Sequence, residues 1–235
     1  MKPQIHKTIL WTLLPALLWT ALTLARPWTL TPRCISSPTA CTPDTVLQID
    51  RFSLSMEEGW AEELSYLTQN FSGVLALLFP FLLYFLRWKT SQPPLTKRMK
   101  VLGQDLVFIL QVMCWNGVFT EVSHWLSKRP RPFVYMHPEI LGVNPSNYTS
   151  FYSGHTSFAA AVNMASLLIL WQTRMPRTLF WIFAFLLEGL VISTASFRVL
   201  AGRHFFTDVL CGALAGTAVA WAVASFHGRL SKHPL

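Results

Sequence analysis

Residues 64–86 read LSYLTQNFSGVLALLFPFLLYFL and lie between Glu63 and Arg87. The run is 23 residues long and holds no charge. Because about 20 residues of α-helix cross the hydrocarbon core of a bilayer, this run is long enough to span a membrane. It predicts a transmembrane helix that covers residues 66–86.

The composition of the whole chain agrees with this prediction. Of its 235 residues, 52% are hydrophobic and 13% are charged, whereas a soluble domain carries about 25% charged residues. These values exclude a disordered chain, a coiled coil and an ordinary cytosolic enzyme. In such a chain the net charge of +8 is typical of cytoplasmic loops or anion sites, so we expect a bilayer and no nucleic acid as partner.

Five further apolar runs predict five further spans. The expected six helices form one membrane-embedded, all-α domain over residues 1–235, with spans at about residues 8–25, 66–86, 101–125, 156–173, 178–197 and 209–226. The third span is the weakest, because Asp105 and Glu121 lie near its ends. The first has some features of a signal peptide, but its 18-residue apolar run exceeds the usual ~7 to 15, which favours a retained helix. In the last span, Gly212 and Gly216 predict close helix packing.

The distribution of Lys and Arg predicts the orientation. If the N-terminus is cytoplasmic, eleven of the 19 basic residues fall on the inner side and eight on the outer side. An excess of basic residues inside is the arrangement that membrane insertion favours. We therefore expect a multi-pass protein of a bacterial plasma (inner) membrane, with the first, third and fifth loops facing the periplasm or the exterior.

The first outer loop carries two local features. Cys34 and Cys41 are close enough in sequence to bridge on an oxidising side, and the sequence leaves a disulfide and free thiols equally open. Between residues 44 and 66, apolar residues recur at helical spacing opposite acidic ones, and they are Ile49, Phe52, Met56, Trp60 and Leu64. This pattern predicts a short amphipathic helix, which lies on the membrane surface or packs against the other outer loops.

Three polar clusters fall on the same outer side. They are Lys128-Arg129-Pro130-Arg131-Pro132 after the third span, Tyr152-Ser153-Gly154-His155 before the fourth, and Arg198, His204 and Asp208 between the fifth and sixth. A basic run alone is usually a solvated or headgroup-facing surface, and Ser-Gly-His alone is consistent with a helix cap. Their convergence at one membrane depth instead predicts a site for a multiply charged anion.

Each residue type has a chemical use at an anion site. Arg131 and Arg198 offer paired N–H donors that match phosphate geometry. Ser153 and Gly154 precede an apolar run, so we expect their backbone N–H groups to point at the anion from a helix N-terminus.

The histidines suggest a reaction on that anion. His204 and Asp208 are four residues apart, which places them on one face of a helix. We expect the Asp208 carboxylate to accept from one ring nitrogen and to leave the other nitrogen as a nucleophile. His155, on a different helix, is then free to protonate a leaving oxygen.

In order and spacing, the clusters resemble the signature of the type 2 phosphatidic acid phosphatase superfamily. That signature is Lys, six residues, Arg-Pro; then Pro-Ser-Gly-His; then Ser-Arg, five residues, His, three residues, Asp, and eight of its eleven positions match. The resemblance implies a six-helix membrane lipid phosphatase with an outer-face active site. It also implies a phosphohistidine on His204, no metal or other cofactor, and a lipid phosphomonoester or diphosphate, such as polyprenyl diphosphate, as substrate.

Three signature positions depart from the pattern. His124 stands in place of Lys, Tyr152 in place of Pro and Phe197 in place of Ser. Lys128 follows His124 by four residues, so on a continuing helix it lies one turn further along the same face. We expect Lys128 to replace part of the lysine's contact with phosphate and His124 to be a weaker, pH-dependent contact. The departures by Tyr152 and Phe197 suggest a narrower pocket or an apolar substrate edge, without deciding between them.

The lost lysine also keeps other functions open. One alternative is a non-catalytic lipid-phosphate binding or transport protein on the same fold, and another is a haloperoxidase-like use of the site with vanadate. Phosphate release from lipid phosphates separates the first alternative from an enzyme. The sequence leaves open which lipid phosphate is the substrate, the source organism and the oligomeric state.

Overall fold

A computed structural model describes residues 2–87, 93–173 and 176–229 of the chain. Within these residues, the regular secondary structure is entirely helical. Six helices are long and apolar enough to cross a membrane. They are α1 (Lys2–Thr29), α3 (Gly59–Arg87), α4 (Leu95–Ser127), α6 (Gly154–Trp171), α7 (Arg177–Leu200) and α8 (Phe206–Phe226). The prediction of an all-α, multi-pass membrane protein with six spans is therefore confirmed.

Several helices extend beyond the predicted spans. The first turns of α4, before residue 101, carry Lys97, Arg98 and Lys100. A count of uncharged residues finds only the part of a helix suited to hydrocarbon, and the charged turns continue the helix towards the headgroups. Of the basic residues assigned to the inner side, Lys89, Arg174 and Lys232 lie outside the described residues.

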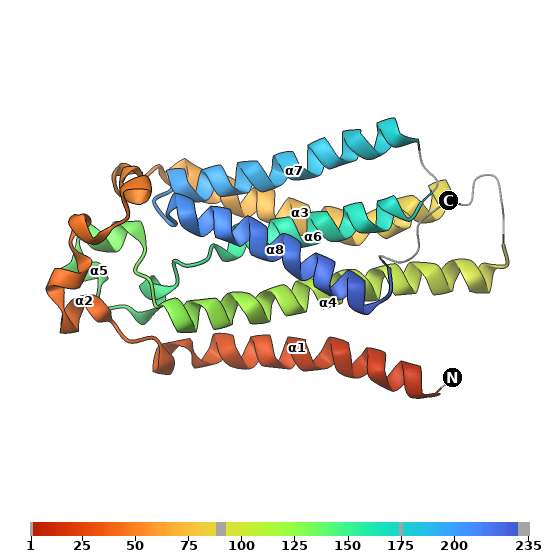
Figure 1. Ribbon diagram of the computed structural model, residues 1–235, viewed down its shortest axis with the longest axis horizontal. Coiled ribbons are helices and arrows are strands. Elements are labelled where there is room, and N and C mark those ends of the chain that lie inside the picture. The colour runs from red at the N-terminus through yellow and green to blue at the C-terminus, as the bar shows by residue number, and fades with distance from the viewer. Residues whose placement is uncertain (1, 88–92, 174–175, 230–235) are drawn as a thin grey trace.

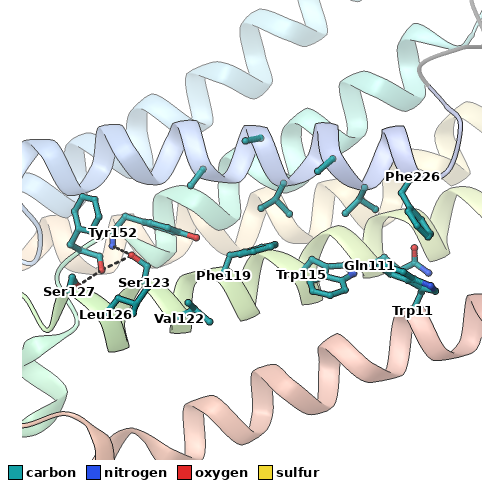
Figure 2. A pocket seen from close by; sticks show the side chains of 16 residues that line it. Trp11, Gln111, Trp115, Phe119, Val122, Ser123, Leu126, Ser127, Tyr152 and Phe226 are labelled. Atoms are coloured by element: carbon teal, nitrogen blue, oxygen red, sulfur yellow. Dashed lines mark hydrogen bonds between the residues drawn. The ribbon is translucent and has the colours of Figure 1, made fainter.

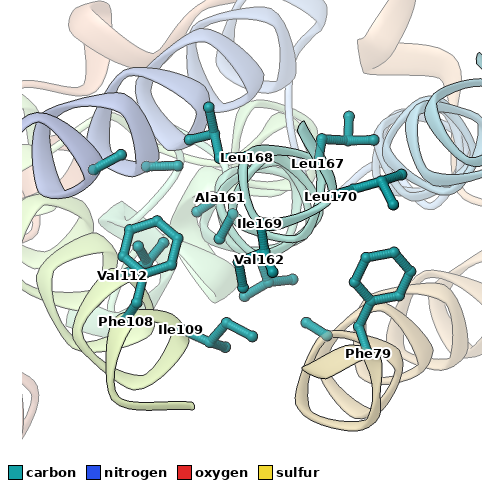
Figure 3. Packing of buried hydrophobic residues seen from close by; sticks show 14 of the residues in the cluster. Phe79, Phe108, Ile109, Val112, Ala161, Val162, Leu167, Leu168, Ile169 and Leu170 are labelled. Carbon is teal, nitrogen blue, oxygen red and sulfur yellow. The ribbon is translucent and has the colours of Figure 1, made fainter. Parts of the chain in front are cut away.

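Helix α6 runs through the centre of the bundle, with α3, α4, α7 and α8 around it (Figures 1 and 3). Ala159, Ala160 and Ala161 are all at most 2% exposed, and such small side chains let the neighbouring helices approach closely. Further along α6, residues 167–170 enter the main core beside Phe79 of α3 and neighbours on α4 (Figure 3). This core fixes the position of α6 in the bundle.

Two glycines of α8 lie against the backbone at the start of α6. A Cβ atom at Gly212 would lie 2.7 Å from the Ser153 carbonyl oxygen, and one at Gly216 would lie 2.1 Å from the Ser157 carbonyl oxygen. The prediction of close helix packing at these glycines is confirmed. The contact presses α8 against the N-terminus of α6.

The shorter elements gather at one end of the bundle, where α6 and α8 begin and α1 ends (Figure 1). They are α2 (Arg33–Ser36), α5 (Pro138–Leu141) and the 3₁₀-helices η1 (Pro38–Cys41), η2 (Pro43–Thr45), η3 (Gln48–Ser55), η4 (Pro132–Tyr135) and η5 (Pro145–Tyr148). A disulfide joins Cys34 and Cys41. The predicted outer loops therefore share one end of the molecule.

The amphipathic stretch over residues 44–66 is divided rather than continuous. Its first part forms η3, while its last part is the start of α3, with extended backbone at Met56 between them. The Glu58 N–H donates to the Leu200 carbonyl oxygen at 2.9 Å, which anchors the break to the end of α7. On η3, Phe52 is exposed and Asp50 is fully buried. The amphipathic helix is thus shorter than predicted, and two of its polar residues, Asp50 and Ser53, face the protein.

Candidate active site

A cavity of about 790 Å³ opens between α1, α3, α4 and α6, and its lining includes Arg131 and Thr149 from the segment that carries the short elements between α4 and α6. Five predicted site residues line it, namely His124, Arg131, Gly154, His155 and His204. Ser153, Arg198 and Asp208 are buried and are not among the lining residues. Within the described chain, no three His, Cys, Asp or Glu side chains are grouped as a metal-ion site.

His204 lies in the turn between α7 and α8 and is 2% exposed. Its Nδ1 atom is 2.8 Å from the Ser150 carbonyl oxygen. Because a carbonyl only accepts, Nδ1 carries the proton and Nε2 of the neutral ring keeps its lone pair. Burial, together with the positive charges of Arg198 and Arg131, holds the pKa of His204 well below its usual value. Its surroundings therefore favour the neutral form of the ring.

Asp208 does not accept directly from His204, contrary to the prediction. Helix α8 begins at Phe206, so His204 precedes the helix and the two side chains do not share a helical face. Asp208 Oδ2 lies 3.8 Å from His204 Nδ1, beyond hydrogen-bond distance. Ser150 links them, since its carbonyl accepts from His204 and its hydroxyl donates to Asp208 Oδ2 at 2.6 Å. The hydrogen bonds therefore connect Asp208 to the imidazole through Ser150.

Arg129 forms an ion pair with Asp208. From the sequence, Arg129 is identified only as part of the first basic cluster. Its Nη1 donates to Asp208 Oδ1 at 2.6 Å and its Nη2 donates to Asp50 Oδ2 at 2.9 Å. Asp50 also accepts from the backbone N–H and hydroxyl of Thr207, at 2.9 and 2.6 Å. Both carboxylates are fully buried, so each needs this cation. Asp50 lies on η3, in a stretch of sequence without a motif, and no sequence signal pointed to it.

The N-terminus of α6 differs from the prediction in one respect. Ser153 is its N-cap, and the Ser153 hydroxyl accepts from the Thr156 N–H at 3.4 Å. The backbone N–H of Ser153 donates to the Asp208 carbonyl oxygen at 3.0 Å, because α8 packs against this turn. It is therefore not directed at an anion. Gly154 and His155 follow, and the first N–H groups of a helix have no acceptor within the helix.

Arg131 and Arg198 bring two guanidinium groups to the site. Arg131 Nη2 donates to Thr149 Oγ1 at 3.1 Å, and Arg198 Nη1 donates to Ser65 Oγ at 3.3 Å. The Nε atom of each arginine is buried and has no hydrogen-bond partner in the described part of the chain. An unpaired donor on a buried cation is unfavourable. Both arginines therefore favour an anionic ligand.

His155 reaches the cavity from the first turn of α6. Its ring packs edge-on against Tyr66 of α3, with the ring centroids 4.7 Å apart. Its Nε2 atom is buried and has no partner among the described residues. The Tyr66 ring also lies 5.8 Å from the guanidinium carbon of Arg198. Tyr66 thus joins two motif residues, but a tyrosine in an apolar span has no pattern that reveals such a contact.

His124 lies at the cavity, but Lys128 does not. His124 Nε2 is 3.2 Å from the Tyr152 carbonyl oxygen, and Nδ1 is 3.9 Å from Glu121 Oε2. Helix α4 ends at Ser127, and Lys128 has left-handed backbone angles, with φ 43° and ψ 39°. Lys128 therefore leaves the helical face that carries His124, and the expectation that it continues this face is wrong.

A second cavity, of about 850 Å³, lies between α4 and α8 and contains the side chain of Tyr152 (Figure 2). Its lining is mostly apolar, with Trp115 and Phe119 along α4, and includes no Lys, Arg, Asp, Glu or His. It therefore offers no charged group for phosphate chemistry.

Phe197 packs edge-on against Trp60, with ring centroids 6.1 Å apart. Tyr152 and Phe197, which replace two residues of the signature, thus do not line the first cavity.

Comparison with known proteins finds one family. A family model described as the PAP2 superfamily matches residues 105–232, more than half of the chain. The match includes all three polar clusters and excludes α1, the first outer loop and α3. No curated protein and no solved structure matches the chain significantly.

Proposed function

Because this chain belongs to the PAP2 superfamily, we propose that it hydrolyses a lipid phosphomonoester or diphosphate through a phosphohistidine on His204. Family membership supports a phosphatase-type lipid hydrolase in general. The observation that carries the finer proposal is the cavity shared by His155, His204 and Arg131. It combines two imidazoles with a guanidinium whose Nε donor is unpaired in the described chain.

The reaction has two steps. In the first, Nε2 of His204 attacks phosphorus, so that an N–P bond forms and the P–O bond to the lipid breaks. The negative charge of the bound phosphate favours the protonated form of His155, which gives its proton to the departing lipid oxygen. In the second, water attacks phosphorus and gives a proton to His155, the N–P bond breaks, and phosphate leaves. Both histidines return to their starting states.

The surrounding donors stabilise the transferring group. Arg131 and Arg198 bind its oxygens, together with the backbone N–H of Gly154, while Ser153 caps the helix that presents this N–H. His124 makes a weaker, pH-dependent contact. Fixed cations and dipoles aimed at developing charge supply the stabilisation that metal ions supply in many phosphoryl transfers. We therefore expect a metal-independent reaction that continues in EDTA.

The site faces the periplasm or the exterior of the plasma membrane in this proposal. The excess of basic residues assigned to the opposite side supports this orientation. The Cys34–Cys41 disulfide at the site end also supports it, because disulfides persist in oxidising compartments. The substrate then comes from the leaflet that faces the same compartment, as a polyprenyl diphosphate or a glycerophospholipid phosphate would.

Phosphate release from a panel of lipid phosphates, with and without EDTA, tests the proposal. Wild-type protein should release phosphate in both conditions, and His204→Ala should release none. His137→Ala is the matched control, since His137 is an exposed histidine outside the cavity. An acid-labile, base-stable label on His204 should accumulate from radiolabelled substrate. Lipid-phosphate binding without release would favour the non-catalytic alternative, and release by His204→Ala would contradict the mechanism.

A further inference from the structure

Helix α1 forms one wall of the active-site cavity, through Trp19, Thr20, Thr23, Leu24 and Arg26. It packs along α4 (Figure 1). Trp19 fills the space left by the missing side chain of Gly117, where a Cβ atom would lie 2.2 Å from its ring. Because α1 lies outside the family match, this wall is supplied by a part of the chain that the family signature does not describe.

Arg26 is held in this wall by a carboxylate of α4. Its Nε donates to Glu121 Oε2 at 2.7 Å, and its Nη2 donates to the other carboxylate oxygen. The Glu121 side chain is 2% exposed, whereas the Arg26 side chain is 30% exposed. A guanidinium has five N–H donors, so the fork that binds Glu121 leaves three of them for another acceptor. Glu121 thus fixes the orientation of a cation that keeps donor capacity at the cavity.

The Arg26–Glu121 ion pair lies beside His124, the residue that replaces the lysine of the first motif. Glu121 is one turn before His124, and its Oε2 atom is 3.9 Å from His124 Nδ1. His124 replaces the motif's permanent cation with a group that is charged only when protonated. Without a second cation, the Glu121 carboxylate would leave this side of the cavity negative and would repel a phosphate. Arg26 is the permanent cation that offsets it.

We propose that Arg26 binds the phosphate oxygens of the substrate and is oriented for this by Glu121. The inference rests on the proposed function, since it concerns the same cavity. Arg26 would then provide, from α1, the permanent positive charge that the first motif lacks at His124. The competing explanation is structural, in which the Arg26–Glu121 pair only fastens α1 to α4.

Equilibrium binding of inorganic phosphate to the detergent-solubilised full chain tests the proposal without turnover. Arg26→Ala should weaken phosphate binding roughly ten- to a hundredfold, the loss expected for a charge-assisted hydrogen bond. Arg26→Lys should restore part of it. Arg33→Ala is the matched control, because Arg33 is exposed at the same end of the bundle but does not line this cavity. It should bind phosphate as the wild type does.

A double variant separates binding from fastening. Arg26→Met with Glu121→Gln removes both charges and keeps much of the side-chain volume, so no buried charge is left unpaired. The proposal expects weak phosphate binding in a protein that melts near the wild-type temperature, with His124→Lys in this background restoring affinity. Wild-type affinity in the double variant would overturn it. If the wild type binds phosphate but releases none from lipid phosphates, the proposed function fails while this inference stands.

Discussion

The contact between α6 and α8 positions the N-terminus of α6, and one added methyl group tests it. In Gly212→Ala the new Cβ would lie 2.7 Å from the Ser153 carbonyl oxygen and 3.5 Å from the Ser153 Cβ. Unstrained contacts between heavy atoms lie near ~3.5 Å, so the helices must separate by roughly 0.5 Å or more. Overpacking of this kind costs about 1–3 kcal/mol.

The displacement should also lower activity, because Ser153 caps the turn that presents Gly154 and His155 to the cavity. Misplacement of a catalytic group by about 1 Å costs up to roughly a hundredfold in rate. We therefore expect Gly212→Ala to lower kcat at least about tenfold.

Two matched glycine variants isolate the cause. Gly216→Ala meets the Ser157 carbonyl oxygen at 2.1 Å, one turn deeper, and should reduce stability with a smaller effect on kcat. Gly189→Ala on α7 meets nothing within 4 Å and should change neither. Thermal unfolding in detergent, followed by tryptophan fluorescence, and phosphate release measure the two effects. A Gly212→Ala protein with the Tm and kcat of Gly189→Ala would refute the reasoning.

Three further variants test other contacts of the site. Ser150→Ala keeps the carbonyl that accepts from His204 but removes the hydroxyl that holds Asp208, so kcat should fall and the free energy of unfolding should fall by about 1.5–3 kcal/mol; an unchanged kcat would show that Asp208 does not act through Ser150. Arg198→Gln removes a positive charge that lowers the pKa of His204, so the acidic limb of kcat/KM should move to higher pH, and a fixed limb would contradict this. Cys34→Ser opens a disulfide with a sequence separation of 7 and should cost about 2–3 kcal/mol, whereas a wild-type Tm unaffected by reductant would argue against the bridge.

The fold was predictable because its signal is local. A run such as residues 64–86 predicts a span from length and charge alone, and the glycines at 212 and 216 predict close packing from their spacing. The helix ends were not predictable in this way. Lys128 leaves the helix in a left-handed conformation, and the boundary of α8 after His204 breaks the spacing argument that paired His204 with Asp208.

The motif residues were predictable as a set, but their partners were not. Asp50 binds Arg129, Ser65 binds Arg198, and Arg26 binds Glu121, over sequence separations of 79, 133 and 95 residues. An acid, a hydroxyl or a cation in a loop or a span has no spacing that identifies its partner across the bundle. Such pairs are fixed by the packing of whole helices.

These pairs also show that residues outside the family match, which covers residues 105–232, help to build the site. The match begins at residue 105, yet Asp50, Ser65 and Tyr66, which precede it, contact Arg129, Arg198 and His155 respectively. Without those partners, Arg129 would lose one of its two buried carboxylates, Arg198 would lose its hydroxyl acceptor, and His155 would lose the ring against which it packs. Breaking a buried charged contact costs about 3–5 kcal/mol, a large part of the stability of a domain. We therefore expect the first outer loop and α3 to determine whether the motif residues keep their catalytic arrangement, while Arg26 on α1 adds to the positive charge that the substrate's phosphate meets.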